Sequence, residues 1–255
     1  MSLVLTPLAG IPLIRHGDNL ADTVLAALRA SKITLAANDI LVLTQKIVSK
    51  AEGQHVDLAR ITPGERALEI AAEARKDPRL VELVVRESRR VLRTAPGAVI
   101  VEHRLGFICA NAGIDHSNAS GSDLPEAEYV LLLPKDPDRS AAEVRGRLEA
   151  ATHFALGVMI IDSHGRAWRL GTVGVCIGLS GIPALVDQRG WKDLFGNTLH
   201  STVVGVADEL AAAASLVMGQ AAEGTPIVHV RGFPYPLREG GLEDLIRPKD
   251  QDLFR

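Results

Sequence analysis

The sequence predicts an α+β fold in which mixed sheets pack against helices, and three observations lead to this class. Apolar residues recur every three or four positions in some segments and form short, nearly continuous runs in others. The two kinds of segment do not alternate strictly, as they would in an α/β fold, and they are not all strands. Hydrophobic residues make up 47% of the 255 positions, which is enough to bury a core in one large domain or two smaller ones.

Helices are expected where the apolar spacing follows one face of a helix. The predicted helices cover 18–30, 63–75, 140–154 and 201–218, and the last of these stops at Gly219. A further helix is expected to begin at Pro78, with an apolar face that extends to Val91 and Leu92. Short apolar runs predict strands at 39–43, 98–102, 106–110, 129–133, 157–161 and 226–230, and a glycine-spaced run predicts another within 165–181.

Breaks in this pattern divide the chain into two expected domains. The breaks lie at Pro78 or at 95–97, and near 178–190. The predicted division is a larger domain of 1–94 and 185–245, an inserted β-rich domain of 95–184, and a polar tail of 246–255.

Composition favours a small-molecule site over a macromolecular surface. The net charge is -3 and aromatic residues make up 4% of the chain, so the basic excess and the stacking platforms of nucleic-acid binders are missing. The first residues have no basic n-region, Pro7 and Pro12 interrupt their apolar stretch, and no run is long enough to span a membrane. We therefore expect a cytoplasmic protein without nucleic-acid or membrane partners, in which Cys109 and Cys176 are buried as small hydrophobic residues.

Common nucleotide and nucleophile motifs do not occur in the sequence. No lysine follows a glycine, which excludes a P-loop, and no two glycines are separated by one residue, which excludes the dinucleotide fingerprint. Neither H-E-x-x-H nor the nucleophile elbow G-x-S-x-G is found. A nucleotide, if one is bound, must be held by an unusual fold.

The segment TQKIVSK (44–50) directly follows a predicted strand and carries two lysines four residues apart. Ammonium groups at the end of a strand suit the oxygens of a phosphate, so Lys46 and Lys50 are candidate phosphate ligands. A solvated amphipathic turn explains the same pattern, and Asp39 and Glu52 could pair with these lysines.

Two aspartates lie just beyond apolar runs. Asp115 follows FICA within ANAGIDHSN, and Asp162 ends GVMIID and is followed by Ser163. Carboxylates at the ends of buried strands are suited to Mg²⁺ or Mn²⁺, which prefer oxygen ligands and leave coordination positions for substrate phosphates. An aspartate of this kind is, taken alone, more often a turn or cap residue, but the same arrangement occurs twice, which favours the metal site.

Arg166 and Arg169 come immediately after the second aspartate and lead into the glycine-spaced strand. Arginine binds phosphate or carboxylate in a bidentate way, so these residues are candidates for holding an anionic substrate. Surface arginines at the edge of a strand are the alternative. The histidines show no metal-ligand spacing and are expected to be surface or hydrogen-bonded residues.

These clusters lie in segments that resemble the coenzyme F420-0:L-glutamate ligases, also called F420-0:gamma-glutamyl ligases. The segments are GIPLIRHGD, NDILVLTQKIVSKAEG, ANAGIDHSN, DSHGRAWRLGTVGVCIG and VADELAAAASLVMGQAAEGTPIV. The resemblance extends over nearly the whole chain. It implies an unusual two-domain α+β fold and an intertwined homodimer, and it implies an enzyme that uses GTP and two divalent ions, Mn²⁺ or Mg²⁺, with a monovalent cation such as K⁺ assisting.

The resemblance also implies roles for individual positions. The guanine-nucleotide contacts fall on Ile11, Pro12, Leu13, Ile14, Gln45, Lys46, Lys50, Asn118, Met218, Gly219, Gln220, Ala221, Ala222, Glu223, Gly224 and Thr225. The metal ligands fall on Asp115 and Asp162 for one ion and on Ser163 and Gln220 for the second. Many relatives have threonine at the position of Ser163, which keeps the hydroxyl.

The reaction implied by the resemblance attaches L-glutamate to the terminal lactyl carboxylate of F420-0 and then adds further glutamates through γ-linked amides. We expect the carboxylate to attack the γ-phosphate of GTP and form an acyl phosphate, with Lys50 and Arg166 as catalytic residues. Two alternatives stay open at this point. One is a nucleotide-dependent amide ligase for a different carboxylic acid, and the other is a non-catalytic nucleotide-binding relative.

Overall fold

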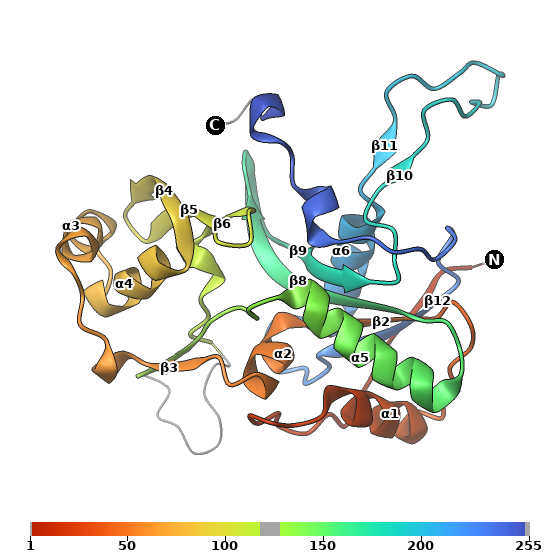
Figure 1. Cartoon of the computed structure of the whole chain (residues 1–255), viewed down its shortest axis with the longest axis horizontal. Helices are drawn as coiled ribbons and strands as arrows, with labels where there is room; N and C mark the ends of the chain where they lie inside the picture. Colours follow the sequence, from red (N-terminus) through yellow and green to blue (C-terminus); the bar gives the residue numbers. More distant parts are fainter. Residues whose placement is uncertain (1, 118–127, 253–255) are drawn as a thin grey trace.

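The computed structural model describes residues 2–117 and 128–252 (Figure 1). Its longer helices are α1 (Leu20–Ala30), α2 (Gln45–Ala51), α3 (Glu65–Ala74), α4 (Pro78–Arg86), α5 (Pro137–Thr152) and α6 (Val206–Met218). Its strands are β1 (Val4–Pro7), β2 (Ile40–Thr44), β3 (His55–Asp57), β4 (Ser88–Ala95), β5 (Ala98–His103), β6 (Ile108–Ala110), β7 (Tyr129–Leu131), β8 (Gly157–Arg166), β9 (Arg169–Ser180), β10 (Val186–Asp187), β11 (Val203–Val204) and β12 (Ile227–Arg231). Short 3-10 helices are η1 (Leu58–Arg60), η2 (Asn111–Gly113), η3 (Leu242–Leu245) and η4 (Lys249–Gln251).

A five-stranded sheet in the order β1-β12-β2-β8-β9 forms the centre of the molecule. β2 and β8 are parallel, and the other neighbouring pairs of this sheet are antiparallel. The sheet is therefore mixed, and together with the helices it confirms the α+β class.

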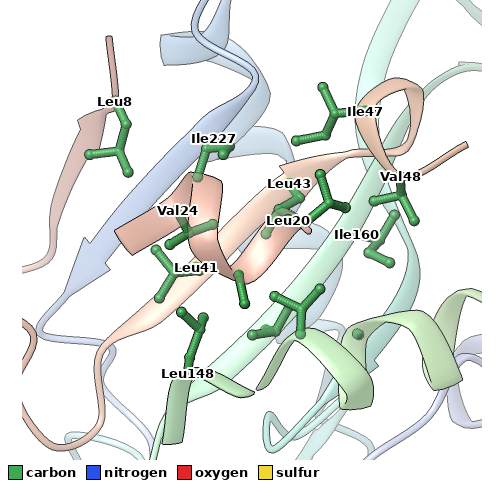
Figure 2. Close-up of a cluster of buried hydrophobic side chains, with 14 of the residues drawn as sticks. Leu8, Leu20, Val24, Leu41, Leu43, Ile47, Val48, Leu148, Ile160 and Ile227 are labelled. Carbon is green, nitrogen blue, oxygen red and sulfur yellow. The ribbon is translucent and has the colours of Figure 1, made fainter. Parts of the chain in front are cut away.

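Both faces of the central sheet are covered, which explains why β2 is an uninterrupted apolar run. Leu41 and Leu43 belong to the cluster between the sheet and helices α1 and α5 (Figure 2). Ile40 and Val42 point to the opposite face, where they pack with residues of α6. This alternation follows from the period of two along a strand.

A second group of elements lies to one side of the central sheet (Figure 1). The antiparallel strands β4, β5 and β6 form a three-stranded sheet, and α3 and α4 pack against it. Its small core contains Ala74, Val84, Val99 and Val101. β4 and β5 are joined by a tight turn in which Gly97 has φ +88, a conformation that glycine adopts without strain.

Two further pairs of strands form small two-stranded sheets. β3 pairs with β7 near α2, and β10 pairs with β11 at the base of a long arm that extends away from the body of the molecule (Figure 1). This arm, residues 186–204, exposes several large apolar side chains.

Some of the predicted helices have different bounds. The expected continuation of the helix that begins at Pro78 is wrong, because the helix ends at Arg86 and Val91 and Leu92 lie in β4. Residues 88–95 pair with β5 instead, and the β-branched Val91 and Thr94 suit this strand. The predicted helix at 201–218 begins only at Val206, since the residues before it form β11.

The segment 44–50 is a helix and not a solvated turn. In α2, the side chains of Gln45, Ile47, Val48 and Ser49 are buried. The expected pairing of Asp39 with Lys46 is not found in the described residues, because Asp39 contacts His229 and Arg231, and Lys46 contacts Asp115.

The domain boundaries stay a prediction. Residues 95–184 contribute β5 and β6 to the three-stranded sheet and β8 and β9 to the central sheet, so strands of the expected insertion pair with strands of the expected larger domain. Cys109 and Cys176 are buried free cysteines, as predicted. None of the helices in residues 2–117 and 128–252 has the length and hydropathy needed to cross a membrane.

Candidate functional site

The ends of the parallel strands β2 and β8 bring two predicted site segments together. Thr44 is opposite Ile161 in the register, so Gln45 and Asp162 follow at the same level of the sheet. Ligands of open sheets commonly bind beyond the carboxyl ends of parallel strands. The segment with Lys46 and Lys50 therefore lies beside the segment with Asp162.

Two further segments reach the same edge through the antiparallel neighbours. The Thr44 amide donates a hydrogen bond to the Pro226 carbonyl at 3.0 Å, which places the loop before β12 beside the end of β2. The Leu8 amide donates to the Ile227 carbonyl at 2.8 Å, so the chain leaves β1 at this edge as well. The structure thus brings together three of the predicted nucleotide-binding segments, which are residues 11–14, 45–50 and 218–225.

Asp115 joins this edge from an irregular segment after η2. Its Oδ1 lies 3.1 Å from Lys46 Nζ, and its Oδ2 accepts a hydrogen bond from Gln45 Nε2. Ser49 Oγ donates to Gln45 Oε1 at 2.9 Å and fixes that amide. Burial raises the pKa of the Asp115 carboxyl, the Lys46 ammonium opposes this shift, and the negative charge of Asp162 adds to it.

Asp162 is held by a histidine two positions along β8, where side chains point to the same face. His164 Nε2 lies 3.0 Å from Asp162 Oδ2, and the His164 ring packs against Phe107 at 5.3 Å. Phe107 in turn stacks on His103 at 5.0 Å. The rings of His103, Phe107 and His164 form one wall of the site. The prediction that the histidines are surface or hydrogen-bonded residues is confirmed for His164.

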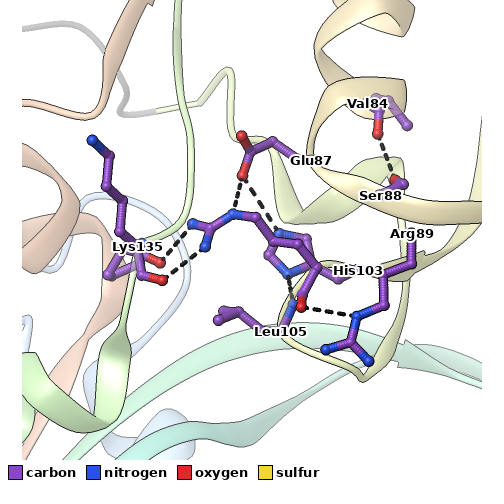
Figure 3. A network of polar contacts seen from close by, with 9 residues as sticks. Val84, Glu87, Ser88, Arg89, His103, Leu105 and Lys135 are labelled. Carbon is purple, nitrogen blue, oxygen red and sulfur yellow. Dashed lines mark hydrogen bonds and ion pairs between the residues drawn. The ribbon is translucent and has the colours of Figure 1, made fainter.

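The turn that carries Phe107 is fixed by a polar network (Figure 3). Arg104 donates to Glu87 Oε2 at 2.6 Å and to the Lys135 carbonyl at 2.7 Å. His103 Nδ1 accepts a hydrogen bond from the Leu105 amide at 3.1 Å. Burial lowers the pKa of His103 to about 3, so this ring is neutral and serves as a hydrogen-bond acceptor.

Ser163 and Gln220 meet on the opposite side of β8 from Asp162. Ser163 Oγ donates to Gln220 Oε1 at 2.9 Å, and Gln220 Nε2 donates to Ser215 Oγ of α6 at 3.0 Å. Thr225 Oγ1 donates to the Met218 carbonyl at 2.9 Å, which closes the loop between them. The structure therefore pairs these two predicted metal ligands directly.

The side chains at this edge fit a hard divalent cation. Nowhere in residues 2–117 and 128–252 do three His, Cys, Asp or Glu side chains gather as a metal site. The predicted ligands instead form two pairs on opposite sides of β8, the carboxylates of Asp115 and Asp162 and the hydroxyl and amide oxygen of Ser163 and Gln220, and all of these are oxygen donors of the kind that Mg²⁺ and Mn²⁺ prefer. Both oxygens of Asp115 have protein partners, Lys46 at Oδ1 and Gln45 at Oδ2, so a metal ion would replace or share these contacts.

The remaining predicted residues are Lys50, Arg166, Arg169 and Asn118. Burial, with the nearby Lys46 charge, lowers the pKa of Lys50. Arg166 and Arg169 face each other at the exposed tip of the β8–β9 hairpin, so their role stays a prediction. Asn118 lies outside the described residues.

Sequence reasoning missed Phe107 as part of the site. It lies in a turn before β6 and comes to β8 only through the tertiary packing of the three-stranded sheet against the central one. The sequence could have indicated His164, because its spacing of two from Asp162 places both side chains on one face of a strand.

Comparison with known proteins gives the family. A family model described as F420-0:gamma-glutamyl ligase matches residues 10–232. Coenzyme F420:L-glutamate ligase of Methanothermobacter thermautotrophicus is 45% identical over 257 residues, which cover 100% of both chains. The protein of the same name from Archaeoglobus fulgidus is 41% identical and covers 100% of this chain and 97% of its own. The one from Methanocaldococcus jannaschii is 40% identical, with 96% and 94% covered. The chain belongs to the F420-0:gamma-glutamyl ligase family.

Proposed function

We propose that the chain is a GTP- and divalent-metal-dependent amide ligase that joins L-glutamate to the terminal lactyl carboxylate of F420-0 and then adds further γ-linked glutamates. The names of the relatives support the acceptor and the amino acid. The observation that carries the proposal is the convergence of three loops with Asp115 and Asp162 at one edge of the central sheet.

The proposed chemistry takes place in two steps. First, an oxygen of the acceptor carboxylate bonds to the γ-phosphorus of GTP, the bond from that phosphorus to the β–γ bridging oxygen breaks, and GDP leaves. Second, the nitrogen of glutamate bonds to the acyl carbon and the bond from that carbon to the phosphate oxygen breaks. The two protons lost by the glutamate ammonium pass to inorganic phosphate and to water, and the product is an amide.

The residues of this chain would assist both steps by position and charge. Lys46 and Lys50, on one face of α2, supply fixed positive charge near the phosphates, and such preorganised charge accounts for a large part of the catalysis of phosphoryl transfer. Backbone amides of the loops at 11–14 and 218–225 would hold the nucleotide. Asp115 and Asp162 would hold one divalent ion and Ser163 and Gln220 a second, and bound ions of this kind neutralise charge on the phosphates.

We also propose that the protein is a homodimer. The arm at 186–204 supports this, because it projects into solvent with Leu194 99% and Phe195 88% exposed. Apolar side chains grouped in this way typically mark an interaction surface. Self-association would cover them.

The direct test is to incubate the protein with F420-0, L-glutamate, GTP and Mn²⁺ and to record the mass of the acceptor. The expected result is a series of products that differ by one glutamyl residue. Asp162→Ala should lower kcat about 100-fold or more, since it removes a carboxylate at the reaction centre. Asp22→Asn, on the exposed side of α1, is the matched control and should retain wild-type activity.

The outcome separates the alternatives. Near wild-type activity of Asp162→Ala would overturn the metal assignment. Release of GDP with another carboxylic acid, without any modification of F420-0, would favour a ligase with a different acceptor. Binding of GTP without turnover on any acid would indicate a non-catalytic relative.

A further inference from the structure

A cavity of about 270 Å³ lies along the free edge of β9, beside the candidate site. Phe107 and Ile108 form one wall, Val175 to Ile177 of β9 form the floor, and residues 242–247 cover it from the C-terminal part of the chain. His164 also lines the cavity. Because His164 contacts Asp162 at 3.0 Å, a single side chain separates the cavity from a predicted metal ligand.

The cover of the cavity is held in place by specific contacts. Lys249 Nζ lies 3.1 Å from Oε1 of the buried Glu102 in β5, which ties the C-terminal segment to the three-stranded sheet. Ile246 packs so closely on Gly106 that a Cβ at that glycine would lie 2.8 Å from Ile246 Cδ1. The cavity is therefore a feature of the folded chain and not a gap under a loose tail.

Asp208 provides an accessible carboxylate in this cavity. Its Oδ1 accepts a hydrogen bond from the Cys176 amide at 2.9 Å, and no contact of its Oδ2 is found in the described residues. Asp138 of α5 accepts a hydrogen bond from the same strand in a similar way, from the Leu179 amide at 2.8 Å. Its second oxygen is also used, because it accepts from the Leu242 amide at 2.9 Å. Capping the edge of β9 thus explains one oxygen of Asp208 and leaves the other open to the cavity and to solvent, where a ligand can reach it.

The surroundings of Asp208 favour a cationic ligand. Burial raises the pKa of this carboxyl, and the hydrogen bond from the Cys176 amide and the nearby His164 act in the opposite direction. A bound ammonium group would also act in that direction, because its positive charge favours the ionised carboxylate.

Arg247 provides the opposite charge at the exposed rim of the cavity. No ion pair or hydrogen bond of its guanidinium is found in the part of the chain that the structure describes. Apolar side chains such as Ile108 and Leu245 line the space between Arg247 and Asp208. The cavity therefore has two carboxylates, Asp208 and Asp252, one guanidinium and an apolar lining, and it can match an amino acid with an ammonium, a carboxylate and methylene groups.

The size of the cavity is compatible with the amino-acid substrate. Pockets for ligands of drug size have volumes of about 300 to 1,000 Å³. A volume of about 270 Å³ is below this range and suits a metabolite of glutamate size.

We propose that this cavity binds the amino-acid substrate, with Asp208 accepting hydrogen bonds from its ammonium group and Arg247 paired with one of its carboxylates. The assignment rests on the proposed function, since it names the place from which the attacking nitrogen reaches the acyl carbon. His164 forms the boundary between the amino acid and the phosphate-binding edge.

The test measures binding of labelled L-glutamate by equilibrium dialysis, with the full chain, with and without GTP and Mn²⁺, and with no acceptor present. Asp208→Asn keeps the size of the side chain and the acceptor for the Cys176 amide but removes the charge. It should weaken glutamate binding about 10-fold or more, as expected for loss of a hydrogen bond to a charged group. Glu209→Gln, the exposed neighbour in the first turn of α6, is the matched control and should bind as wild type does.

A second variant and a kinetic readout test the location independently. Ile108→Trp fills the cavity from β6 without changing charge and should also weaken glutamate binding. In glutamylation assays, Asp208→Asn should raise KM for L-glutamate about 10-fold or more while KM for GTP stays within about twofold.

The outcomes distinguish the two proposals. If the wild type binds no L-glutamate, or if Asp208→Asn binds it within twofold of wild type, the cavity assignment is overturned. A rise in KM for F420-0 alone would also overturn it, because the cavity would then hold the acceptor. If the wild type binds L-glutamate in this cavity but leaves F420-0 unmodified, the cavity assignment stands and only the proposed acceptor fails.

Discussion

Asp39 is a carboxylate enclosed in the core at the start of β2. His229 Nε2 lies 2.9 Å and Arg231 Nη2 2.6 Å from its Oδ2. The expectation that Asp39 would pair with a nearby lysine failed because the partners come from β12, 190 and 192 residues along the chain. A single sequence carries no signal for contacts of this separation, which depend on β12 lying next to β2.

Asp39→Asn should lower the free energy of unfolding by about 2–3 kcal/mol, because Arg231 and His229 lose their charged partner. Burial acts to raise the pKa of Asp39, but the hydrogen bonds from Arg231 and His229 outweigh it and lower the pKa below its usual value. The stability that this network contributes is therefore complete above the unfolded-state pKa of about 3.9 and is lost as the pH falls through the lower folded-state pKa.

Urea unfolding at pH 7 and at acid pH measures this effect. The stability difference between wild type and Asp39→Asn should shrink towards zero as the carboxylate of the wild type becomes protonated. Asp187→Asn removes an exposed carboxylate that pairs with Arg189 and should leave the unfolding midpoint unchanged. An equal loss of stability in both variants would show that the core network has no special role.

At the scale of elements, apolar periodicity located most helices and strands but not all of their ends. The helix from Pro78 ends at Arg86 because the next residues gain more by pairing with β5 than by extending the helix. The predicted strand within 165–181 is present as β9, and its glycines explain how closely it packs. A Cβ at Gly174 would lie 2.4 Å from Ser215 Cβ and 2.5 Å from the Ala211 carbonyl oxygen of α6.

Gly174→Ala should therefore destabilise the protein by about 1–3 kcal/mol, since the backbone of α6 must move away from β9. The same shift would displace Ser215, which holds Gln220, so metal-dependent activity should fall as well. Thermal unfolding and the glutamylation rate measure the two effects. Gly165→Ala is the control, because nothing lies within 4 Å of its Cβ position. Equal melting temperatures for both variants would contradict the close packing.

At the scale of the whole molecule, the exposed arm at 186–204 carries the prediction about assembly. Leu194→Asp with Phe195→Asp should weaken self-association about 30-fold or more, as for residues at the centre of an interface. Sedimentation velocity over a range of concentrations measures the shift from dimer to monomer. Leu170→Asp, at a residue that is 98% exposed on the β8–β9 hairpin, is the control. A wild-type protein that is monomeric at micromolar concentration would contradict the homodimer.

The sequence predicts the residues of the candidate site but not how they are arranged. The segments with Gln45, Asp115, Asp162 and Gln220 carried recognisable patterns, and the resemblance to a family assigned them roles. The order of strands that joins them could not be predicted, because β12 lies between β1 and β2 although it follows both in the chain. Phe107 and the cavity beside β9 depend in the same way on packing between distant segments.

The position of β12 has a consequence for the timing of assembly during synthesis. A nascent chain that has emerged only as far as Thr225 contains β1, β2, β8 and β9 but not the strand that links β1 to β2. Contacts across such long separations form late and slow the search for the native topology. The complete central sheet, and with it the proposed nucleotide site, should therefore form abruptly after residue 231 has cleared the ribosomal exit tunnel, and any chaperone that protects this chain must shield the open edge of β2 until then.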